Sequence, residues 1–209
     1  MISIQLPIIF QNKYEKLKPF IRQRLDDFKN VQESKYFYEL CFCICTPQSR
    51  ASSAMAVQLE LEKLEFLNKE FDPTPILRNK NNYIRFHNQK SKRLILIKKQ
   101  WVEIKAILDS EMTGEEKREW INDNVNGIGR KESAHYLRNI GYTNLAILDR
   151  HILKHLVTSG VFKEVPNIST KSRYDDVSAK FMEFSNEVRI PMDELDLLFW
   201  AEEAGEILK

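Results

Sequence analysis

Apolar residues recur three and four positions apart along most of the chain, which is the spacing of an amphipathic helix. Leu17, Ile21 and Leu25, for example, lie on one face of a first predicted helix. Segments that alternate apolar and polar residues, as half-buried β-strands do, are few. The pattern therefore predicts an all-α fold.

Further helices follow from the same spacing and from helix-breaking residues. Segment 36–44 is apolar at most positions, which predicts a buried helix that ends before Pro47. Ser49 or Ser52 is expected to cap the next helix, because a serine side chain accepts hydrogen bonds from the first N–H groups of a helix. The other predicted helices are 94–108, one that begins after Thr113, 131–139, one that begins after Asp149, 171–188, and one that begins near Pro191 and stops at Gly205.

Charge is distributed unevenly along the chain. The formal net charge is only +2 in 209 residues, so a polyanionic partner must be met by a local concentration of positive charge. Segment 78–99 supplies one, with eight Lys or Arg residues and no acid, whereas 193–209 contains six acids and one lysine. We expect the two segments to face different partners.

The three cysteines, Cys41, Cys43 and Cys45, are too close in one segment to form an unstrained disulfide, so we expect them to be reduced and buried. No Cys or His pair completes a zinc site and no cysteine cluster suits iron and sulfur, so no metal site is predicted.

No apolar run approaches the roughly 20 residues of a transmembrane helix, and the N-terminus does not resemble a signal peptide. We expect an intracellular protein, in the cytoplasm or nucleoid, that does not contact membranes.

The sequence "NGIG" at 126–129 separates two predicted helices and must reverse the chain within four residues. Glycine adopts positive φ freely and lets another backbone approach, so Gly127 and Gly129 can turn the first N–H groups of the next helix outward. Such groups bind phosphate. Gly-x-Gly alone is common in turns. The flanking amphipathic helices and the following Arg130 favour a helix-hairpin-helix, at about 119–139, that contacts DNA without reading its sequence.

Lys131 lies in the first turn of the helix after the hairpin. The positive end of a helix dipole disfavours an ammonium group relative to the neutral amine, which is the nucleophilic form of lysine. Lys131 is therefore a candidate nucleophile. The alternative is that it only neutralises a DNA phosphate, and the spacing does not separate the two.

Asp149 follows an apolar segment, 142–148, and precedes the next predicted helix. In that position its side chain can cap the helix, which is a purely structural role. A helix followed by an extended return would also bring Asp149 towards the start of the Lys131 helix and set a carboxylate beside the candidate amine. His135 and His151 are expected to pack or to face phosphate rather than bind a metal.

The sequence "VNGIGRKESAHYLRNIGYTNLAILDRHIL" resembles the helix-hairpin-helix DNA glycosylase superfamily, in which a hairpin lysine is followed by a loop that ends in an aspartate. The 18-residue step from Lys131 to Asp149 is similar to that of bifunctional members such as endonuclease III. The chain lacks the four-cysteine cluster of endonuclease III, and unlike the alkyladenine members it keeps the lysine. Together with "ELCFCICTPQSRA" and "ELDLLFW", these features most resemble the archaeal-type, second-class 8-oxoguanine DNA glycosylase/AP lyases.

The resemblance implies an enzyme that removes 8-oxoguanine from double-stranded DNA and then cleaves the abasic strand. Lys131 would attack C1′ of the damaged nucleoside, displace the base and form a Schiff base that permits β-elimination. Asp149 would stabilise the positive charge that develops on the sugar and assist proton transfer. The nucleotide must leave the base stack, and Gln48 would fill the gap, although a Gln after Pro47 could equally cap the next helix.

The base pocket is expected near the end of the chain. Asp196 and Trp200 lie four residues apart on one predicted helix, so an acid and a stacking ring share a face. A place for Trp200 in the ordinary core is the alternative. The resemblance implies that Lys209, as the C-terminal residue, distinguishes 8-oxoguanine from guanine, because its terminal carboxylate can accept a hydrogen bond from the extra N7–H. Phe86 is a candidate for the second stacking face.

The expected architecture is two helical lobes with a DNA-binding cleft between them. One lobe covers 33–143 and contains the helix-hairpin-helix, and the other covers 1–32 and 144–209 and carries Asp149 and the base-recognition segment. We expect a monomer that binds double-stranded DNA with an oxidised base and needs no cofactor, apart from a monovalent cation held by backbone carbonyls of the hairpin, as in related hairpins. The alternatives are a glycosylase/lyase for another oxidised base and a non-catalytic helix-hairpin-helix protein that only binds DNA.

Overall fold

The structure is a computed structural model that describes residues 5–205, 207 and 209. This part of the chain consists of α-helices, two short 3-10 helices and loops, without a β-strand. The chain divides into two compact units, one formed by the segments up to Lys29 and from Gly141 onward, and the other by Asn30–Ile140. Both junctions lie three residues before the predicted ones.

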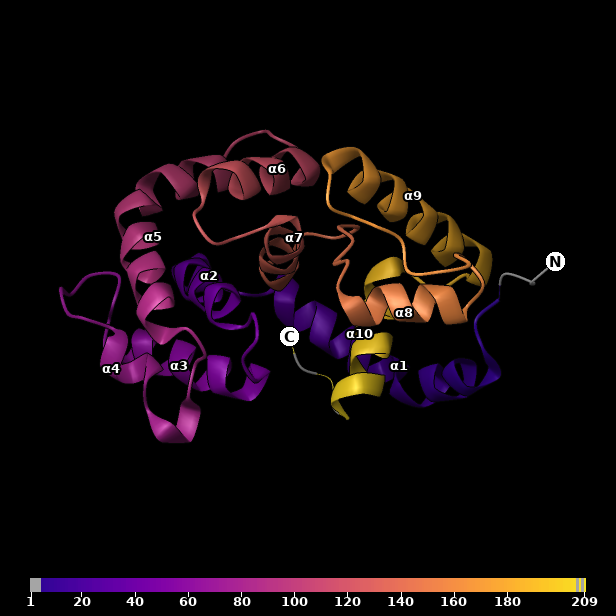
Figure 1. Cartoon of the computed structure of the whole chain (residues 1–209), viewed down its shortest axis with the longest axis horizontal. Coiled ribbons are helices and arrows are strands. Elements are labelled where there is room, and N and C mark those ends of the chain that lie inside the picture. The colour runs from indigo at the N-terminus through magenta and orange to yellow at the C-terminus, as the bar shows by residue number, and fades with distance from the viewer. Residues whose placement is uncertain (1–4, 206, 208) are drawn as a thin grey trace. The chain divides into compact units, whose positions relative to one another are not determined.

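The unit Asn30–Ile140 is built around a buried helix, α2 (Tyr36–Cys45), in which every residue from Phe37 onward is buried. Helix α2 packs against α3 (Ala51–Lys63), α5 (His87–Leu108) and α7 (Arg130–Asn139) (Figure 1). A helix without an exposed polar face requires neighbours on all sides, so α2 fixes the positions of these three helices. The remaining elements of this unit are η1 (Glu33–Lys35), α4 (Thr74–Leu77), η2 (Lys80–Asn82) and α6 (Gly114–Asn124).

Helix α2 contains one acidic residue, Glu39, which is also buried. Its carboxylate accepts hydrogen bonds from the side-chain amides of Gln58 in α3 (2.7 Å) and Asn139 in α7 (3.2 Å). A buried carboxylate is stable only when such donors surround it. Glu39 therefore joins the three helices by specific bonds in addition to apolar packing.

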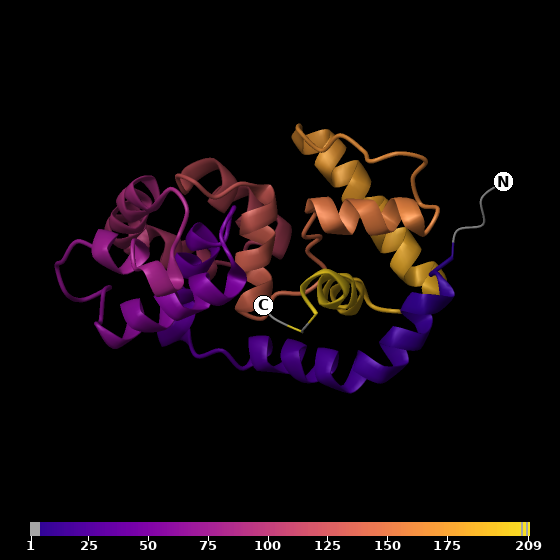
Figure 2. The ribbon, with the colours of Figure 1, turned by 60° about the horizontal axis from the view of Figure 1, so that its bottom comes forward.

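The unit formed by the two ends of the chain is built around α10 (Met192–Ala204). Helices α1 (Ile8–Lys29) and α8 (Arg150–Thr158) pack against α10, as does α9 (Lys171–Val188), and Figure 2 shows α10 almost end-on among them. The core contains Tyr174, Phe181 and Phe184 of α9 and Leu195, Leu198 and Phe199 of α10. This core positions the start of α8, which follows Asp149, and helix α10, which carries Asp196 and Trp200.

The helix starts agree only partly with the predicted caps. Thr113 forms a capping box with Glu116 at the start of α6, as two reciprocal bonds of 3.2 Å and 2.7 Å show. The prediction that Ser49 or Ser52 caps α3 is wrong. Helix α3 begins after Arg50, which makes no side-chain capping bond, and Ser52 lies inside the helix.

Candidate active site

The reversal between α6 and α7 uses one glycine in the left-handed region rather than two. Gly127 has φ 90°, whereas Gly129 is extended, with φ −98° and ψ 180°, and forms the N-cap of α7. A Cβ on Gly127 would lie 2.3 Å from Cδ of Arg93, so the flexible end of that side chain would have to move in addition. Ile128 between them is buried and anchors the turn. Because Gly129 supplies no side-chain cap, the first N–H groups of α7 point out of the helix end.

Lys131 is the second residue of α7, at the end of the helix where the dipole is positive. Its side chain is 24% exposed, and its Nζ lies 3.5 Å from Oε1 of Glu132. The neighbouring Arg130 donates from Nε to Oε2 of Glu119 in α6 at 3.0 Å. Arg130 thus links α7 to α6 across the hairpin. The adjacent Lys131 amine reaches the solvent beside the carboxylate of Glu132.

Asp149 is the N-cap of α8, which confirms the predicted cap. Its Oδ1 accepts hydrogen bonds from the backbone N–H groups of His151 (2.8 Å) and Ile152 (2.9 Å). The segment before it is held by Tyr174 of α9, whose hydroxyl donates to the carbonyl of Ala146 at 2.6 Å. The position of Asp149 is therefore held by the capping bonds that follow it and by the anchored segment that precedes it. The second carboxylate oxygen, Oδ2, takes no part in the two capping bonds.

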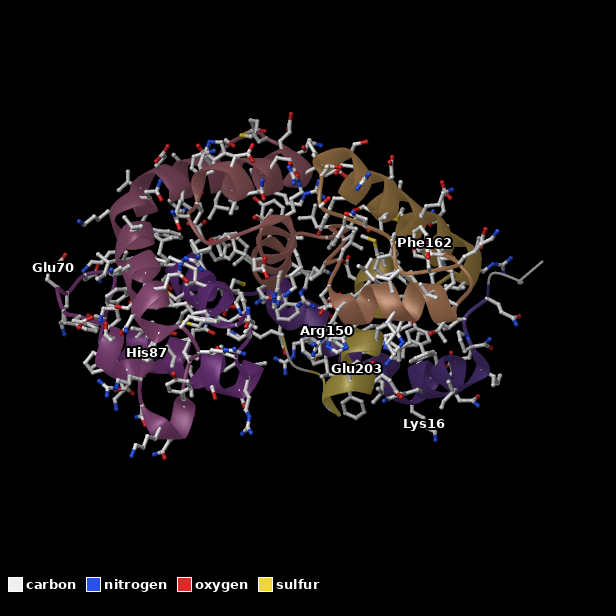
Figure 3. All side chains as sticks on the ribbon, viewed as in Figure 1. Lys16, Glu70, His87, Arg150, Phe162 and Glu203 are labelled. Atoms are coloured by element: carbon white, nitrogen blue, oxygen red, sulfur yellow. The ribbon has the colours of Figure 1, made fainter. Side chains whose placement is uncertain are left out.

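The ring of Trp200 stacks on His151, with ring centroids 5.9 Å apart and planes inclined by 28°. Nδ1 of His151 lies 3.0 Å from Oε2 of Glu203. The other ring nitrogen of His151, Nε2, accepts a hydrogen bond from Nε of Arg150 at 3.0 Å. Arg150 and Glu203, on α8 and α10, are labelled in Figure 3. Since the backbone of His151 also binds Asp149, one residue connects the predicted catalytic carboxylate to the predicted stacking ring. Its position two residues after Asp149 is a sequence signal for the capping bond alone, since the stacking on Trp200 joins distant parts of the chain.

The other predicted recognition residues differ in exposure and in the unit to which they belong. Asp196 is buried on α10, whereas Trp200 is partly exposed, so of this pair only Trp200 offers surface to a base. Lys209 is partly exposed and belongs to the same unit. Gln48 and Phe86 are exposed and belong to the unit Asn30–Ile140 together with Lys131. Gln48 is not the cap of α3 that the sequence allowed, because that cap position is Arg50.

Segment 78–99 is a basic surface with one exception. Lys90 is only 2% exposed, and its Nζ donates hydrogen bonds to the backbone carbonyls of Cys45 (2.7 Å) and Pro47 (2.6 Å). Burial lowers the pKa of Lys90 to about 8. Lys90 lies at helical spacing from Leu94 and Ile97 on the buried face of α5, a signal that the prediction of a uniform basic patch did not use. The exposed basic residues of the segment are Arg78, Lys80, Arg85, Lys92 and Lys99.

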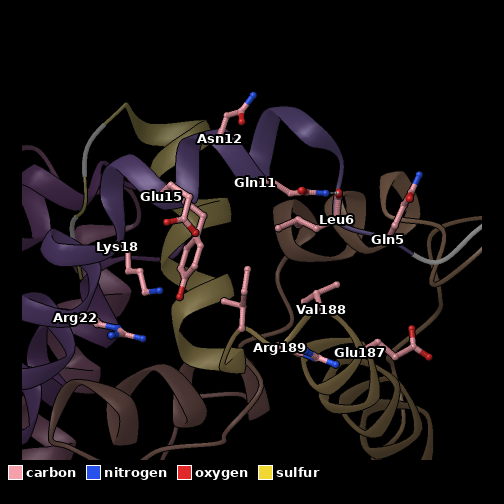
Figure 4. A pocket seen from close by; sticks show the side chains of 12 residues that line it. Gln5, Leu6, Gln11, Asn12, Glu15, Lys18, Arg22, Glu187, Val188 and Arg189 are labelled. Atoms are coloured by element: carbon pink, nitrogen blue, oxygen red, sulfur yellow. Dashed lines mark hydrogen bonds between the residues drawn. The ribbon is translucent and has the colours of Figure 1, made fainter.

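A cavity of about 570 Å³ lies between α1 and the end of α9, in the unit formed by the two chain ends (Figure 4). Tyr14 and Arg22 line it. The Tyr14 hydroxyl donates to Glu194 at 2.5 Å, and Nε of Arg22 donates to the same carboxylate at 3.1 Å. Burial, followed by the effect of Glu194, raises the pKa of Tyr14. These three groups bind one another, and none of the predicted site residues lines the cavity. The cavity is therefore separate from the candidate site.

The described residues lack a metal-binding cluster and a membrane-spanning helix. There, no three His, Cys, Asp or Glu side chains gather as a metal site would require. None of the helices in that part of the chain combines the length and apolar character needed to cross a bilayer.

Comparison with known proteins identifies the family. The family model described as 8-oxoguanine DNA glycosylase matches residues 21–190. The chain belongs to this family. An 8-oxoguanine DNA glycosylase/AP lyase of Fusobacterium nucleatum is 38% identical over 208 residues, which cover 94% of either chain. The relative of the same name in Methanocaldococcus jannaschii is 32% identical over 202 residues, covering 94% of this chain and 95% of the relative.

Solved structures of 8-oxoguanine DNA glycosylases share the fold. The glycosylase/lyase of Methanocaldococcus jannaschii, in complex with a 15mer DNA containing 8-oxoguanine, has a TM-score of 0.83 at 31% identity and covers 97% of this chain and 100% of that one. The enzyme of Thermotoga maritima has a TM-score of 0.81 at 28% identity, with 96% of each chain covered. The predicted family and the predicted all-α fold are confirmed. The roles of individual residues stay predictions.

Proposed function

We propose that this member of the 8-oxoguanine DNA glycosylase family removes 8-oxoguanine from double-stranded DNA and then cleaves the abasic strand. The observation that carries the proposal is the position of Lys131, an amine that reaches solvent in the first turn after an uncapped hairpin. A phosphate held by the N–H groups of that turn sets the adjoining sugar near the amine.

The chemistry divides between Lys131 and Asp149. The Lys131 amine attacks C1′, the glycosidic bond breaks, and the base departs with the bonding electron pair and gains a proton. The Asp149 carboxylate stabilises the positive charge that develops on the sugar during this step. Loss of a proton from the nitrogen and opening of the sugar ring give a Schiff base. Loss of a proton from C2′ then expels the 3′ phosphate, which is β-elimination.

Binding of DNA is assigned to the hairpin and to the basic segment 78–99. Gly127 and Gly129 bring the backbone close to a phosphate, and Arg130 lies at the same helix end. A monovalent cation at hairpin carbonyls remains part of the proposal. The five exposed cations of the basic segment would add a sequence-independent and salt-dependent attraction.

Recognition of the base is assigned to Trp200, with Asp196, Lys209 and Phe86 as further candidates. Trp200 is partly exposed and is supported from behind by His151, so its ring can stack on an extruded base. Gln48 would occupy the space that the extruded nucleotide leaves. The expected partner is duplex DNA with an oxidised base, acted on by a monomer inside the cell.

Trapping with borohydride tests the proposal. We expect the wild type to form a covalent adduct with duplex DNA that contains 8-oxoguanine, because borohydride reduces the Schiff base to a stable amine. Lys131→Gln should form none. An undiminished adduct in that variant would exclude Lys131 as the nucleophile. An adduct on an oxidised pyrimidine in preference to 8-oxoguanine would assign another lesion, and salt-dependent binding without any adduct would indicate a non-catalytic DNA-binding protein.

A further inference from the structure

Lys90 lies in the first turns of α5 and binds the end of another helix. Its Nζ donates to the carbonyl of Cys45, the last residue of α2, at 2.7 Å, and to the carbonyl of Pro47 at 2.6 Å. It also lies 3.3 Å from Oγ of Ser49. The second carbonyl belongs to the residue directly before Gln48, so the ammonium group reaches beyond the helix end into the turn that carries Gln48.

Lys90 also lies one helical turn after Phe86, the N-cap of α5. Its N–H donates to the carbonyl of Phe86 at 3.0 Å, which is the ordinary helical bond between residues four apart. Ser49 strengthens the link between the same two segments, because its Oγ accepts a hydrogen bond from the N–H of Arg85 at 3.1 Å. Lys90 and Ser49 thus join the Gln48 turn to the Phe86 turn by bonds to both main chains. His87, labelled in Figure 3, is the first residue of α5 and directly follows Phe86.

Gln48 and Phe86 share an unusual backbone conformation. Gln48 has φ 58° and Phe86 has φ 59°, both in the left-handed region that non-glycine residues rarely enter. In the Gln48 turn the N–H of Ser49 donates to the carbonyl of Thr46 at 2.9 Å, and Pro47 occupies the second position, a pattern in which the third position normally favours glycine. Strain of this kind persists only where surrounding bonds hold it. Here the buried amine of Lys90 binds the Gln48 turn directly, and Ser49 joins that turn to the residue before Phe86.

We propose that Lys90 is a positioning residue that fixes Gln48 and Phe86 relative to each other, so that both side chains meet the distorted duplex in one preset arrangement. The inference rests on the proposed function, since it concerns extrusion of the damaged nucleotide. A rigid pair of contacts loses less conformational entropy on binding than two mobile loops, and small misplacements of such groups slow the reaction strongly.

The buried charge itself distinguishes this role from ordinary packing. Positions 94, 97, 104 and 108 on the same face of α5 are apolar, and an apolar residue at position 90 would continue the stripe without the cost of desolvating an ammonium group. Lysine offers instead three donors at one point, which two backbone carbonyls and the Ser49 hydroxyl use.

The first experiment compares Lys90→Met with Lys63→Met. Lys63 is exposed on α3 in the same unit and lies outside the basic segment, so its variant loses the same charge without disturbing the turn or the proposed DNA contacts. Under single-turnover conditions with saturating enzyme, we expect Lys90→Met to slow release of 8-oxoguanine from duplex DNA by about 10-fold to 100-fold. Strand cleavage at a preformed abasic site, which has no base to extrude, should slow far less. The Lys63→Met variant should keep both rates. Equal slowing of both reactions by Lys90→Met would overturn the proposal.

A double-mutant cycle tests whether Lys90 acts through Gln48. In a Gln48→Ala background, Lys90→Met should slow base release by only about twofold more, because the side chain that it positions is already absent. An unchanged, fully multiplicative effect would contradict the positioning role. Ser49→Ala removes one bond of the same link and serves if Lys90→Met does not fold; it should show the same selective loss, and its absence would count against the inference. A wild type that releases no 8-oxoguanine would instead refute the proposed function.

Discussion

Asp149 combines two roles that different substitutions separate. Its carboxylate caps α8 through two hydrogen bonds and is also the proposed stabiliser of the sugar cation. Asparagine keeps the capping oxygen but not the charge, whereas alanine removes both. We expect Asp149→Asn to keep DNA binding and stability and to lose base release. Asp149→Ala should also lower the free energy of unfolding by about 1 kcal/mol.

Single-turnover excision assays and urea unfolding of the two Asp149 variants check this expectation. Full excision activity in Asp149→Asn would reduce the residue to a helix cap. Equal stability of the two variants would contradict the energetic importance of the capping bonds seen at His151 and Ile152.

Gln48 offers a second separation of stability from activity. Because its φ is 58°, replacement by glycine removes the left-handed strain, and Gln48→Gly should raise the free energy of unfolding by about 1 kcal/mol. The same change removes the side chain proposed to fill the gap in the duplex, so base release should slow. Thermal unfolding and excision rates measured on the same preparation provide the test. A destabilised variant would show that the turn is not strained.

The residues of the candidate site were accessible to sequence reasoning to different degrees. Lys131 and Asp149 stand at fixed places relative to a hairpin and a helix start, so local pattern locates both. Lys90 was hidden in a run of basic residues, because charge suggests exposure and only its spacing from Leu94 and Ile97 indicates burial. The stacking of His151 on Trp200 joins residues far apart in the chain, which periodicity cannot reveal.

At the scale of elements, the two hairpin glycines are unequal, and this difference yields a matched pair of variants. Gly127 has positive φ and lies against Arg93, whereas an alanine at Gly129 would meet only Oε2 of Glu132, at 3.4 Å. We expect Gly127→Ala to cost about 2 kcal/mol of stability or more and to weaken DNA binding. Gly129→Ala should cost less than about 1 kcal/mol, the usual loss at a helix N-cap.

Chemical denaturation and DNA titration of the two glycine variants distinguish them. If both lose the same amount, the left-handed turn and the close approach of Arg93 do not determine the stability of the hairpin.

The sequence predicted which segments are helical better than it predicted where each helix begins. The apolar character of α2 and the Thr113 capping box both appear in the local sequence. By contrast, α5 begins at His87, well before the predicted start at Leu94, because the left-handed Phe86 forms its N-cap without a side-chain bond. A start that depends on backbone conformation held by Lys90 and Ser49 leaves no local signal.

At the scale of the whole molecule, Lys90 makes stability depend on pH. Its pKa in the folded protein is lowered to about 8 from 10.5, mainly by burial; Arg93 acts in the same direction, while Cys45 and Glu132 oppose it. Between these values the unfolded chain binds more protons at Lys90 than the folded chain, so the free energy of unfolding gains from rising pH in that window.

We therefore expect the free energy of unfolding of the wild type to rise relative to that of Lys90→Met, by roughly 1–3 kcal/mol, as the pH rises from about 8 to about 10. Urea unfolding of both proteins across this range measures it, and subtraction removes the contribution of the other titrating groups. A constant difference would mean that Lys90 titrates as an exposed lysine does.

The division into two units was visible in the sequence only in part. The predicted junctions fall close to Asn30 and Ile140 because helix ends occur there. The assignment of α1 to the same unit as α10 depends on contacts between opposite ends of the chain, such as those of Tyr14 and Arg22 with Glu194. Such pairs have no local signature.

The burial of the cysteines in α2 protects their thiols from oxidation by peroxides. Cys41, Cys43 and Cys45 are the three cysteines of the chain, and all are 0% exposed. Burial raises the pKa of Cys41 and raises the pKa of Cys45 to about 12. Peroxides attack the thiolate, which is scarce at both residues, and they must first reach it. A family whose substrate arises from oxidative attack on guanine is here represented by a chain that withholds its cysteine thiols from the same oxidants.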